Sequence, residues 1–180
     1  MKISQIIYDY YNKPKEHKRE IGRYWASDIN SIRGGWLTPS NYFKQKPINK
    51  WSQNNIFWGC AGEAELAKIF KEQGIKFETQ IKKELQIEDF ILVVKPDFIT
   101  EEFVMETKCP ANETKGIPDK WLDQLEAEYQ AFKKPVYLGI LNKSGDKIIN
   151  TYLYKPNEER WSEIIKILIS FHKRLCKTQK

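Results

Sequence analysis

The residues best suited to chemistry are charged side chains on two neighbouring segments whose apolar pattern predicts strands. Asp97 follows an apolar run, and Glu106 and Lys108 lie on the next apolar segment. Because side chains alternate along a strand, Glu106 and Lys108 are expected to project from one face and to flank Thr107. A short turn at residues 101–102 would join the two strands and bring Asp97 beside Glu106.

These oxygen-bearing groups match the preferences of a hard divalent cation. Mg²⁺ takes oxygen ligands, usually one or two carboxylates together with waters and a substrate phosphate. Asp97, Glu106 and the backbone carbonyl of Thr107 are candidates for the protein's share of such ligands. A lysine two residues after Glu106 can orient an attacking water and offset charge that develops on a phosphate. The spacing therefore indicates metal-assisted hydrolysis of a phosphate ester.

A third carboxylate is expected to point inward from a helix. The sequence predicts a helix over residues 56–73, which Gly74 would end. On a helical wheel Glu63 shares a stripe with apolar residues, and charged residues lie opposite. Burying a carboxylate costs several kcal/mol unless a cation or strong donors meet it. An internal ion pair would satisfy Glu63 as well as a metal site would. The stripe comprises Gly59, Glu63, Leu66, Ala67 and Phe70.

The remaining pattern predicts an α/β fold with a mixed central sheet flanked by helices. Strands are expected around residues 76–87, 90–99, 102–109, 136–141 and 147–154, with a hairpin turn at 144–146. Helices are expected at about 118–133 and 157–176. A length of 180 residues suits one domain over 1–180. Within it we distinguish a basic, aromatic and helical segment (1–50), a core (51–156) and a C-terminal amphipathic helix (157–180).

The net charge of +6 is concentrated at the N-terminal end. Residues 1–50 contain ten Lys or Arg and four Asp or Glu, which leaves twenty of each for residues 51–180. Aromatic residues, among them Tyr24 and Trp25, are interleaved with these cations. Cations attract phosphates, and aromatic rings can stack on unpaired bases. Core aromatic residues beneath a solvated basic surface would give the same composition.

Other classes of protein find little support. No apolar run reaches the ~18 residues of a membrane span, and residues 1–15 lack the features of a signal peptide. The three cysteines are far apart and form no CxxC pair, so neither a zinc site nor an iron–sulfur cluster is expected. We expect an intracellular, cytoplasmic protein of prokaryotic or viral origin, with no membrane partner.

The pair Pro96-Asp97 followed by Glu106-x-Lys108 resembles the signature of the PD-(D/E)XK nuclease superfamily. The segment from Gly59 to Gly74 is similar to the glutamate helix of its λ-exonuclease-like and RecB-like branches. Three further segments, residues 24–29, 105–110 and 117–129, resemble motifs of the same enzymes. Together the segments span about residues 19–141 in a consistent order.

The resemblance implies a restriction-endonuclease-like core and a Mg²⁺- or Mn²⁺-dependent deoxyribonuclease. Some relatives hold an iron–sulfur cluster with four cysteines, and this chain, with three, departs from them. Asp97 and Glu106 would be metal ligands, and Glu63 would contribute directly or through water. Lys108 would position the nucleophilic water. Gln124 would lie near the scissile strand or help to orient Lys108. The substrate would be linear or single-stranded DNA ends, in recombination, repair or replication, and the protein could form a homo-oligomer.

The resemblance also assigns DNA contacts and shows one departure. Ser27 and Arg33 would contact phosphate, and Tyr24 and Trp25 beside them are the candidates for contact with bases. RecB-type enzymes usually space a glutamine and a tyrosine four residues apart, whereas Gln124 and Tyr129 are five apart. Helical periodicity places Tyr129 among core residues.

Two alternatives to an exonuclease remain open. A structure-specific endonuclease of the same fold would cut closed circular DNA, which an exonuclease leaves intact. A non-catalytic DNA-binding module would bind DNA without metal-stimulated cleavage.

Overall fold

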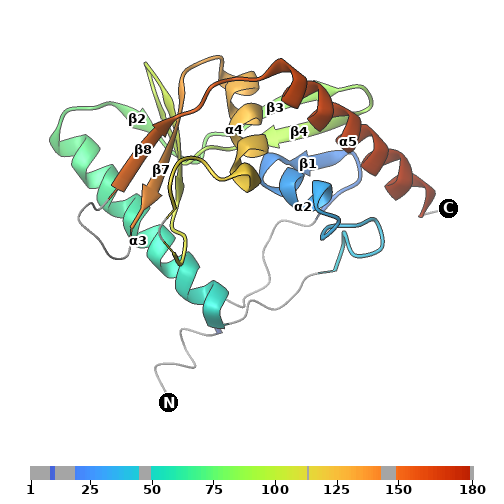
Figure 1. Ribbon diagram of the computed structural model, residues 1–180, viewed down its shortest axis with the longest axis horizontal. Helices are drawn as coiled ribbons and strands as arrows, with labels where there is room; N and C mark the ends of the chain where they lie inside the picture. The colour runs from blue at the N-terminus through green and yellow to red at the C-terminus, as the bar shows by residue number, and fades with distance from the viewer. Residues whose placement is uncertain (1–8, 11–18, 45–49, 113, 143–148, 179–180) are drawn as a thin grey trace.

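The computed structural model contains two mixed β-sheets covered by helices (Figure 1). It describes residues 9–10, 19–44, 50–112, 114–142 and 149–178. The three-stranded sheet has the order β1-β4-β3, and the five-stranded sheet has the order β2-β5-β6-β7-β8. The predicted α/β class with mixed pairing is confirmed, but the strands are divided between two sheets instead of forming one central sheet.

The three-stranded sheet joins the N-terminal segment to a hairpin. Strand β1 (Arg23–Trp25) pairs in parallel with β4 (Phe90–Val94), and β3 (Lys83–Ile87) pairs with β4 in antiparallel orientation. We expected only helices in residues 1–50. The segment does contain the 3-10 helix η1 (Ala26–Asp28) and helix α2 (Ile29–Arg33), but β1 precedes them.

The five-stranded sheet carries most of the candidate site. Strands β2 (Phe77–Glu78), β5 (Phe98–Thr100) and β6 (Val104–Lys108) form its antiparallel part. Strand β6 then pairs in parallel with β7 (Val136–Leu141), and β8 (Ile149–Leu153) returns antiparallel to β7. The chain between the parallel strands passes through helix α4, as a parallel connection requires.

The segment predicted as one strand over residues 90–99 is interrupted at Lys95-Pro96-Asp97. Proline has no backbone N–H and cannot donate to a sheet ladder, which favours a break there. The chain leaves the first sheet at Val94 and enters the second at Phe98. Asp97 therefore lies in the short segment that connects the two sheets.

Three long helices cover the sheets, close to the predicted ranges. Helix α3 (Lys50–Glu72) is followed by Gly74, whose φ of 70° suits a left-handed residue just past a helix end. Helix α4 (Asp119–Phe132) contacts strands of both sheets. Helix α5 (Glu158–Lys177) packs on α4 and α2, away from α3 (Figure 1). The predicted hairpin turn at 144–146 lies outside the described residues.

The ends of α4 and α5 have local causes. Pro118 immediately precedes α4 with extended geometry, and Asn157 Oδ1 accepts a hydrogen bond from Arg160 N at the start of α5. Within the part of the chain that the structure describes, no helix combines the length and apolar character needed to span a bilayer.

Candidate active site

Strand pairing brings Asp97 next to Glu106. The register places Phe98 opposite Met105, and Asp97 immediately precedes Phe98, close enough to Glu106 for its charge to act on that carboxyl group. Asp97 Oδ2 accepts hydrogen bonds from Thr107 N at 2.7 Å and from Thr107 Oγ1 at 2.5 Å. These two donors fix the orientation of the Asp97 carboxylate.

Lys108 lies on the same strand face as Glu106. Its Nζ donates to Glu106 Oε1 at 2.5 Å and to Gln124 Oε1 of helix α4 at 3.1 Å. Gln124 Nε2 in turn donates to Glu128 Oε1 at 3.0 Å. A continuous chain of hydrogen bonds therefore runs from strand β6 to helix α4.

Helix α3 places Glu63 close enough to Asp97, Glu106 and Lys108 for their charges to act on it. Glu63 is half-buried on the stripe with Leu66, while Glu65 and Lys68 on the opposite side are exposed. The close approach of α3 to strand β7 occurs at Gly62. A Cβ there would lie 2.2 Å from Leu141 Cδ1, so only glycine fits without displacement.

The site concentrates negative charge. Burial raises the pKa of Glu63 to about 7, and the charges of Asp97 and Glu106 act in the same direction, whereas Lys108 opposes them. Burial lowers the pKa of Lys108, but the charge of Glu106 and its hydrogen bond more than offset this, and the net shift is upward. The lysine is therefore held as a cation among carboxylates.

Glu106 and Glu128 form a buried carboxyl pair. Glu106 is 4% exposed and Glu128 is fully buried. Burial raises the pKa of both groups, and the charge of Glu106 adds to the shift at Glu128. Neither Glu106 Oε2 nor Glu128 Oε2 meets an N–H or O–H donor in the described part of the chain. The two groups are placed to share a hydrogen bond when one of them carries a proton.

The donor chemistry fits a hard divalent cation, although the ligands do not converge fully. Among residues 9–10, 19–44, 50–112, 114–142 and 149–178, no three His, Cys, Asp or Glu side chains are gathered closely enough to hold a metal ion. The Asp97 carboxylate is turned to Thr107, and one Glu106 oxygen is turned to Lys108. The second Glu106 oxygen has no donor within that same part of the chain. The raised pKa of Glu63 reflects repulsion from Asp97 and Glu106 as well as burial, and a bound cation would offset that repulsion.

Tyr24 is not available for contact with a base, which corrects the expectation from the sequence. Its ring is fully buried, and its hydroxyl lies 2.6 Å from His172 Nδ1. Burial raises its pKa to about 12. Trp25, the next residue along β1, faces the other side of the sheet and is half-buried, with Lys82 Nζ 5.4 Å from its ring centre.

The two predicted phosphate contacts differ in their surroundings. Ser27 is exposed in η1. Arg33 is instead engaged within the protein: its Nε and second terminal nitrogen bind the two oxygens of Asp123 at 2.7 and 3.1 Å, and a third nitrogen donates to Glu163. A guanidinium held in this forked geometry has its donor edge occupied, so we do not retain Arg33 as a phosphate contact.

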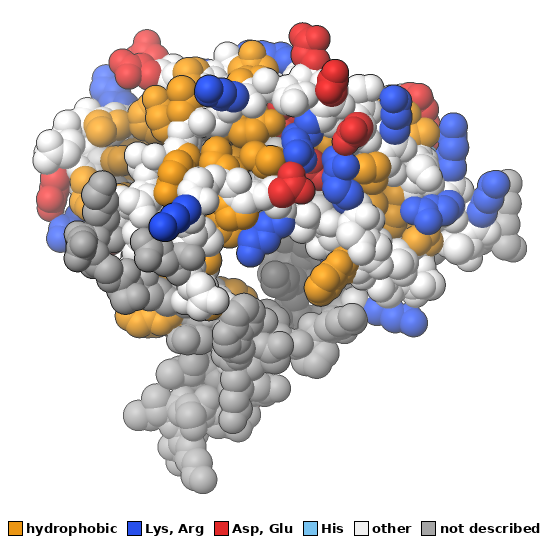
Figure 2. All heavy atoms as spheres, viewed as in Figure 1, with side chains coloured by type: hydrophobic (Ala, Val, Ile, Leu, Met, Phe, Trp, Pro, Cys, Tyr) orange, Lys and Arg blue, Asp and Glu red, His pale blue; other side chains and the backbone are white. Residues whose placement is uncertain are grey.

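The described side chains on the face seen in Figure 2 form no continuous basic track. On the face seen in Figure 2, basic and acidic side chains are interspersed with apolar ones. Five of the ten cations of residues 1–50 lie outside the described residues, namely Lys2, Lys13, Lys15, Lys18 and Lys46.

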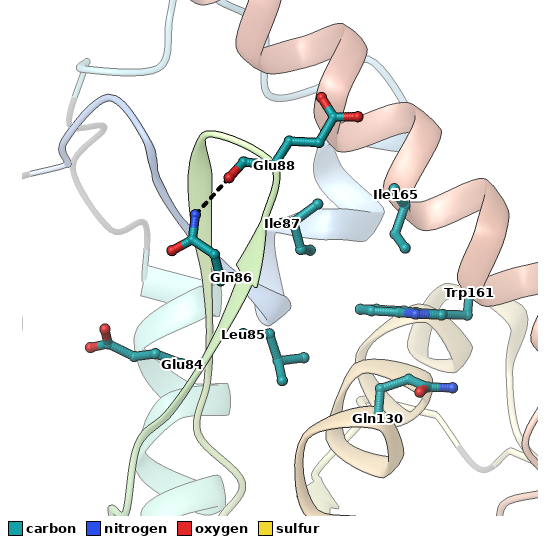
Figure 3. Close-up of a pocket in the computed structure, with 8 residues that line it drawn as sticks. All are labelled: Glu84, Leu85, Gln86, Ile87, Glu88, Gln130, Trp161 and Ile165. Atoms are coloured by element: carbon teal, nitrogen blue, oxygen red, sulfur yellow. Dashed lines mark hydrogen bonds between the residues drawn. The ribbon is translucent and has the colours of Figure 1, made fainter.

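A separate cavity of about 500 Å³ lies between the three-stranded sheet and helices α4 and α5 (Figure 3). Trp161 and Ile165 of α5 face Leu85 and Ile87 of strand β3 across it. None of its lining residues belongs to the predicted site, so the cavity is distinct from the cluster around Lys108.

Two features of the site were not anticipated from the sequence. The glycine that α3 requires is Gly62, whereas Gly59, which the motif emphasises, has open space around it. Glu128 stands four residues after Gln124, and this i to i+4 spacing was the one available signal that the two side chains meet. Tyr129, as expected, packs with the apolar cluster around Leu125 and Leu138.

Comparison with known proteins supports the fold. No family model matches the sequence, and no curated protein matches it. Among solved structures, the protein SSO0001 superposes with a TM-score of 0.68 at 14% identity, covering 95% of this chain and 85% of that one. An alkaline exonuclease from Laribacter hongkongensis, LHK-Exo, gives a TM-score of 0.64 at 12% identity, covering 97% and 93%. Its complex with dAMP gives 0.64 at 14% identity, covering 88% and 90%. The chain therefore shares the fold of this exonuclease.

Proposed function

We propose that this protein is a divalent-metal-dependent deoxyribonuclease that digests DNA from its ends. The observation that carries the proposal is the position of Lys108. Its ammonium is held by Glu106 and Gln124 beside Asp97 and Glu63, at the crossing between two sheets. A half-buried cation among three carboxylates is costly for stability alone, and such perturbed groups are typical of catalytic sites.

The sequence motif and the contacts described above support a role for each residue. Asp97 and Glu106 would hold Mg²⁺ or Mn²⁺, Glu63 would contribute directly or through water, and the Thr107 carbonyl would be a further donor. The cation, when bound, supplies positive charge that polarises the phosphodiester and lowers the pKa of a water. Lys108 has three N–H donors and uses two for Glu106 and Gln124. The third meets no acceptor among the described residues and can orient water or stabilise charge on a phosphate oxygen.

The choice of substrate rests on the shared fold and on the motifs. LHK-Exo is an alkaline exonuclease and has been solved with dAMP. Residues 24–29, which resemble an early motif of end-digesting enzymes, place Ser27 on the surface. We expect Ser27 and Trp25 to contact the DNA end, and we expect the enzyme to act in the cytoplasm.

The test compares linear and closed circular DNA. End-labelled duplex and single-stranded substrates are incubated with wild-type protein, Asp97→Ala and Lys108→Ala in Mg²⁺, Mn²⁺ or EDTA. Lys155→Ala, an exposed lysine away from the site, is the matched control. We expect wild type and Lys155→Ala to degrade linear DNA only, and only with metal. Lys108→Ala should bind DNA normally but cleave at least ~100-fold more slowly, because the nucleophile is no longer ordered.

Three results would contradict the proposal. Cleavage by Lys108→Ala at near the wild-type rate would remove the assigned role of the lysine. Cutting of closed circles would replace the exonuclease by an endonuclease. Binding without cleavage in any metal would show a non-catalytic DNA-binding protein.

A further inference from the structure

Helix α4 buries three acidic side chains, and two of them have clear structural roles. Asp123 binds Arg33 of α2 and Arg160 of α5, which ties the three helices together. Glu126 accepts hydrogen bonds from the Tyr154 hydroxyl at 2.7 Å and from Asn157 N at 2.8 Å, which fixes the start of α5. Each of these carboxylates meets donors from another segment of the chain.

The third buried acid, Glu128, lacks such a role. It is fully buried, and no ion pair among the described residues includes it. Its hydrogen-bond donor is the side-chain amide of Gln124, on its own helix, and its second oxygen faces Glu106. A leucine of similar volume would fill this space without the cost of burying a carboxyl group. The presence of an acid therefore calls for an explanation outside the packing of α4.

The Gln124 amide supplies that explanation because its two ends are chemically different. Its oxygen accepts from Lys108 Nζ at 3.1 Å, and its nitrogen donates to Glu128 Oε1 at 3.0 Å. An ammonium group has only donors, so the opposite orientation would set the amide N–H groups against the Lys108 N–H groups. It would also set the amide oxygen against the Glu128 oxygen. An acceptor at position 128 therefore selects the one amide orientation that Lys108 can use.

We propose that Glu128 is a positioning residue that locks the Gln124 amide and thereby holds the Lys108 ammonium beside Glu106. The contact itself does not depend on what the protein does, but its effect on catalysis rests on the proposed nuclease function. The residue four positions after Gln124 thus takes part in the site, whereas Tyr129 packs in the core.

The first experiment measures the contact in the metal-free protein. The Gln124 side-chain N–H₂ resonances are assigned in a ¹⁵N–¹H NMR spectrum by their loss in Gln124→Ala. We expect Glu128→Leu to move them to the positions of a free glutamine and to speed their exchange with water. Glu128→Gln should keep them shifted, because its amide oxygen still accepts from Gln124 and its N–H₂ can donate to Glu106. The matched control, Glu126→Leu on the same helix, should leave them in place.

The second experiment measures kcat and KM on end-labelled linear DNA, with melting temperatures to confirm folding. We expect Glu128→Leu to lower kcat by about 10- to 100-fold, the usual effect of removing a supporting hydrogen bond at a metal site, with KM within about twofold of wild type. Glu128→Gln should restore kcat to within about threefold of wild type, and Glu126→Leu should lower stability but not kcat.

Unchanged Gln124 resonances in Glu128→Leu would overturn the proposal, and so would equal losses of kcat in Glu128→Leu and Glu128→Gln. If the wild-type protein cleaves no DNA with any metal, the proposed function fails. The amide spectra would then still decide whether Glu128 holds Gln124.

Discussion

Replacing Glu63 with glutamine should stabilise the metal-free protein at alkaline pH while abolishing its proposed activity. Glutamine keeps the volume and polarity of the side chain but removes its ionisable group. In the folded protein, burial and the charges of Asp97 and Glu106 raise the pKa of Glu63 from its ordinary value of 4.5 to about 7. The wild-type protein therefore carries an unfavourable charge at pH 8 that the variant does not carry.

The pH dependence follows from this shift. Below pH 4.5 Glu63 is protonated in both the folded and unfolded states, and the wild-type protein and the variant should be equally stable. As pH rises from 4.5 to about 7, the unfolded chain ionises first, and the wild-type free energy of unfolding falls. The full shift corresponds to roughly 3 kcal/mol, at 1.36 kcal/mol per pH unit. Because solvent reaches the half-buried side chain and screens it, we expect about 1–2 kcal/mol.

The assay is urea unfolding of both proteins in EDTA at intervals between pH 5 and pH 8.5. The difference in free energy of unfolding should grow with pH in favour of Glu63→Gln and level off above pH 8. Adding Mg²⁺ at pH 8 should narrow the difference, because a cation that binds only the folded wild-type site stabilises it. The exposed Glu65→Gln is the matched control and should show no such trend.

A difference that does not change with pH would refute the electrostatic reasoning. A variant less stable than wild type at pH 8 in EDTA would show that Glu63 accepts stabilising hydrogen bonds that outweigh its burial. Either result would remove the argument that this helix brings excess negative charge to the site.

Two further predictions concern packing. Gly62→Val should destabilise the protein by about 1–3 kcal/mol in urea unfolding, because its Cβ would lie 2.2 Å from Leu141 Cδ1. Gly59→Ala should be neutral or stabilising by up to ~1 kcal/mol, because nothing lies within 4 Å of its Cβ, and equal effects of the two variants would contradict the close approach at Gly62. Tyr24→Phe removes the hydroxyl that lies 2.6 Å from His172 Nδ1 and should lower the free energy of unfolding by about 1–2 kcal/mol. The Kd for single-stranded DNA should not change, and weaker binding would show that Tyr24 contacts DNA after all.

The sequence determined the features that depend on local periodicity. The stripe of helix α3 placed Glu63 inward, and alternation along β6 placed Glu106 and Lys108 on one face. The short connection between β5 and β6 allows only a narrow range of registers, which is why Asp97 could be expected beside Glu106. Such patterns involve residues a few positions apart, and the geometry of one helix or hairpin fixes their relation.

The division into two sheets was beyond such patterns. Strand β1 has three residues and pairs with β4, which follows it by more than sixty positions. A segment so short carries little periodic signal, and its conformation depends on the partner strand. Pro96 in the sequence indicates a possible break in the strand, but only the tertiary structure shows that the chain passes from one sheet to the other there.

What the sequence by itself determined is thus the set of acidic and basic groups on α3, on β6 and just before β5, together with the inward direction of Glu63 and the shared face of Glu106 and Lys108. The tertiary structure decided which other residues join or leave that set. Tyr24 is no longer a candidate for DNA contact because it is buried against His172, 148 positions away, and Arg33 is not one because it binds Asp123, 90 positions away. Glu128 joins the site because it contacts Gln124 and lies beside Glu106. Burial and hydrogen-bond partners depend on packing between distant segments, and a side chain's own neighbours in sequence do not specify them.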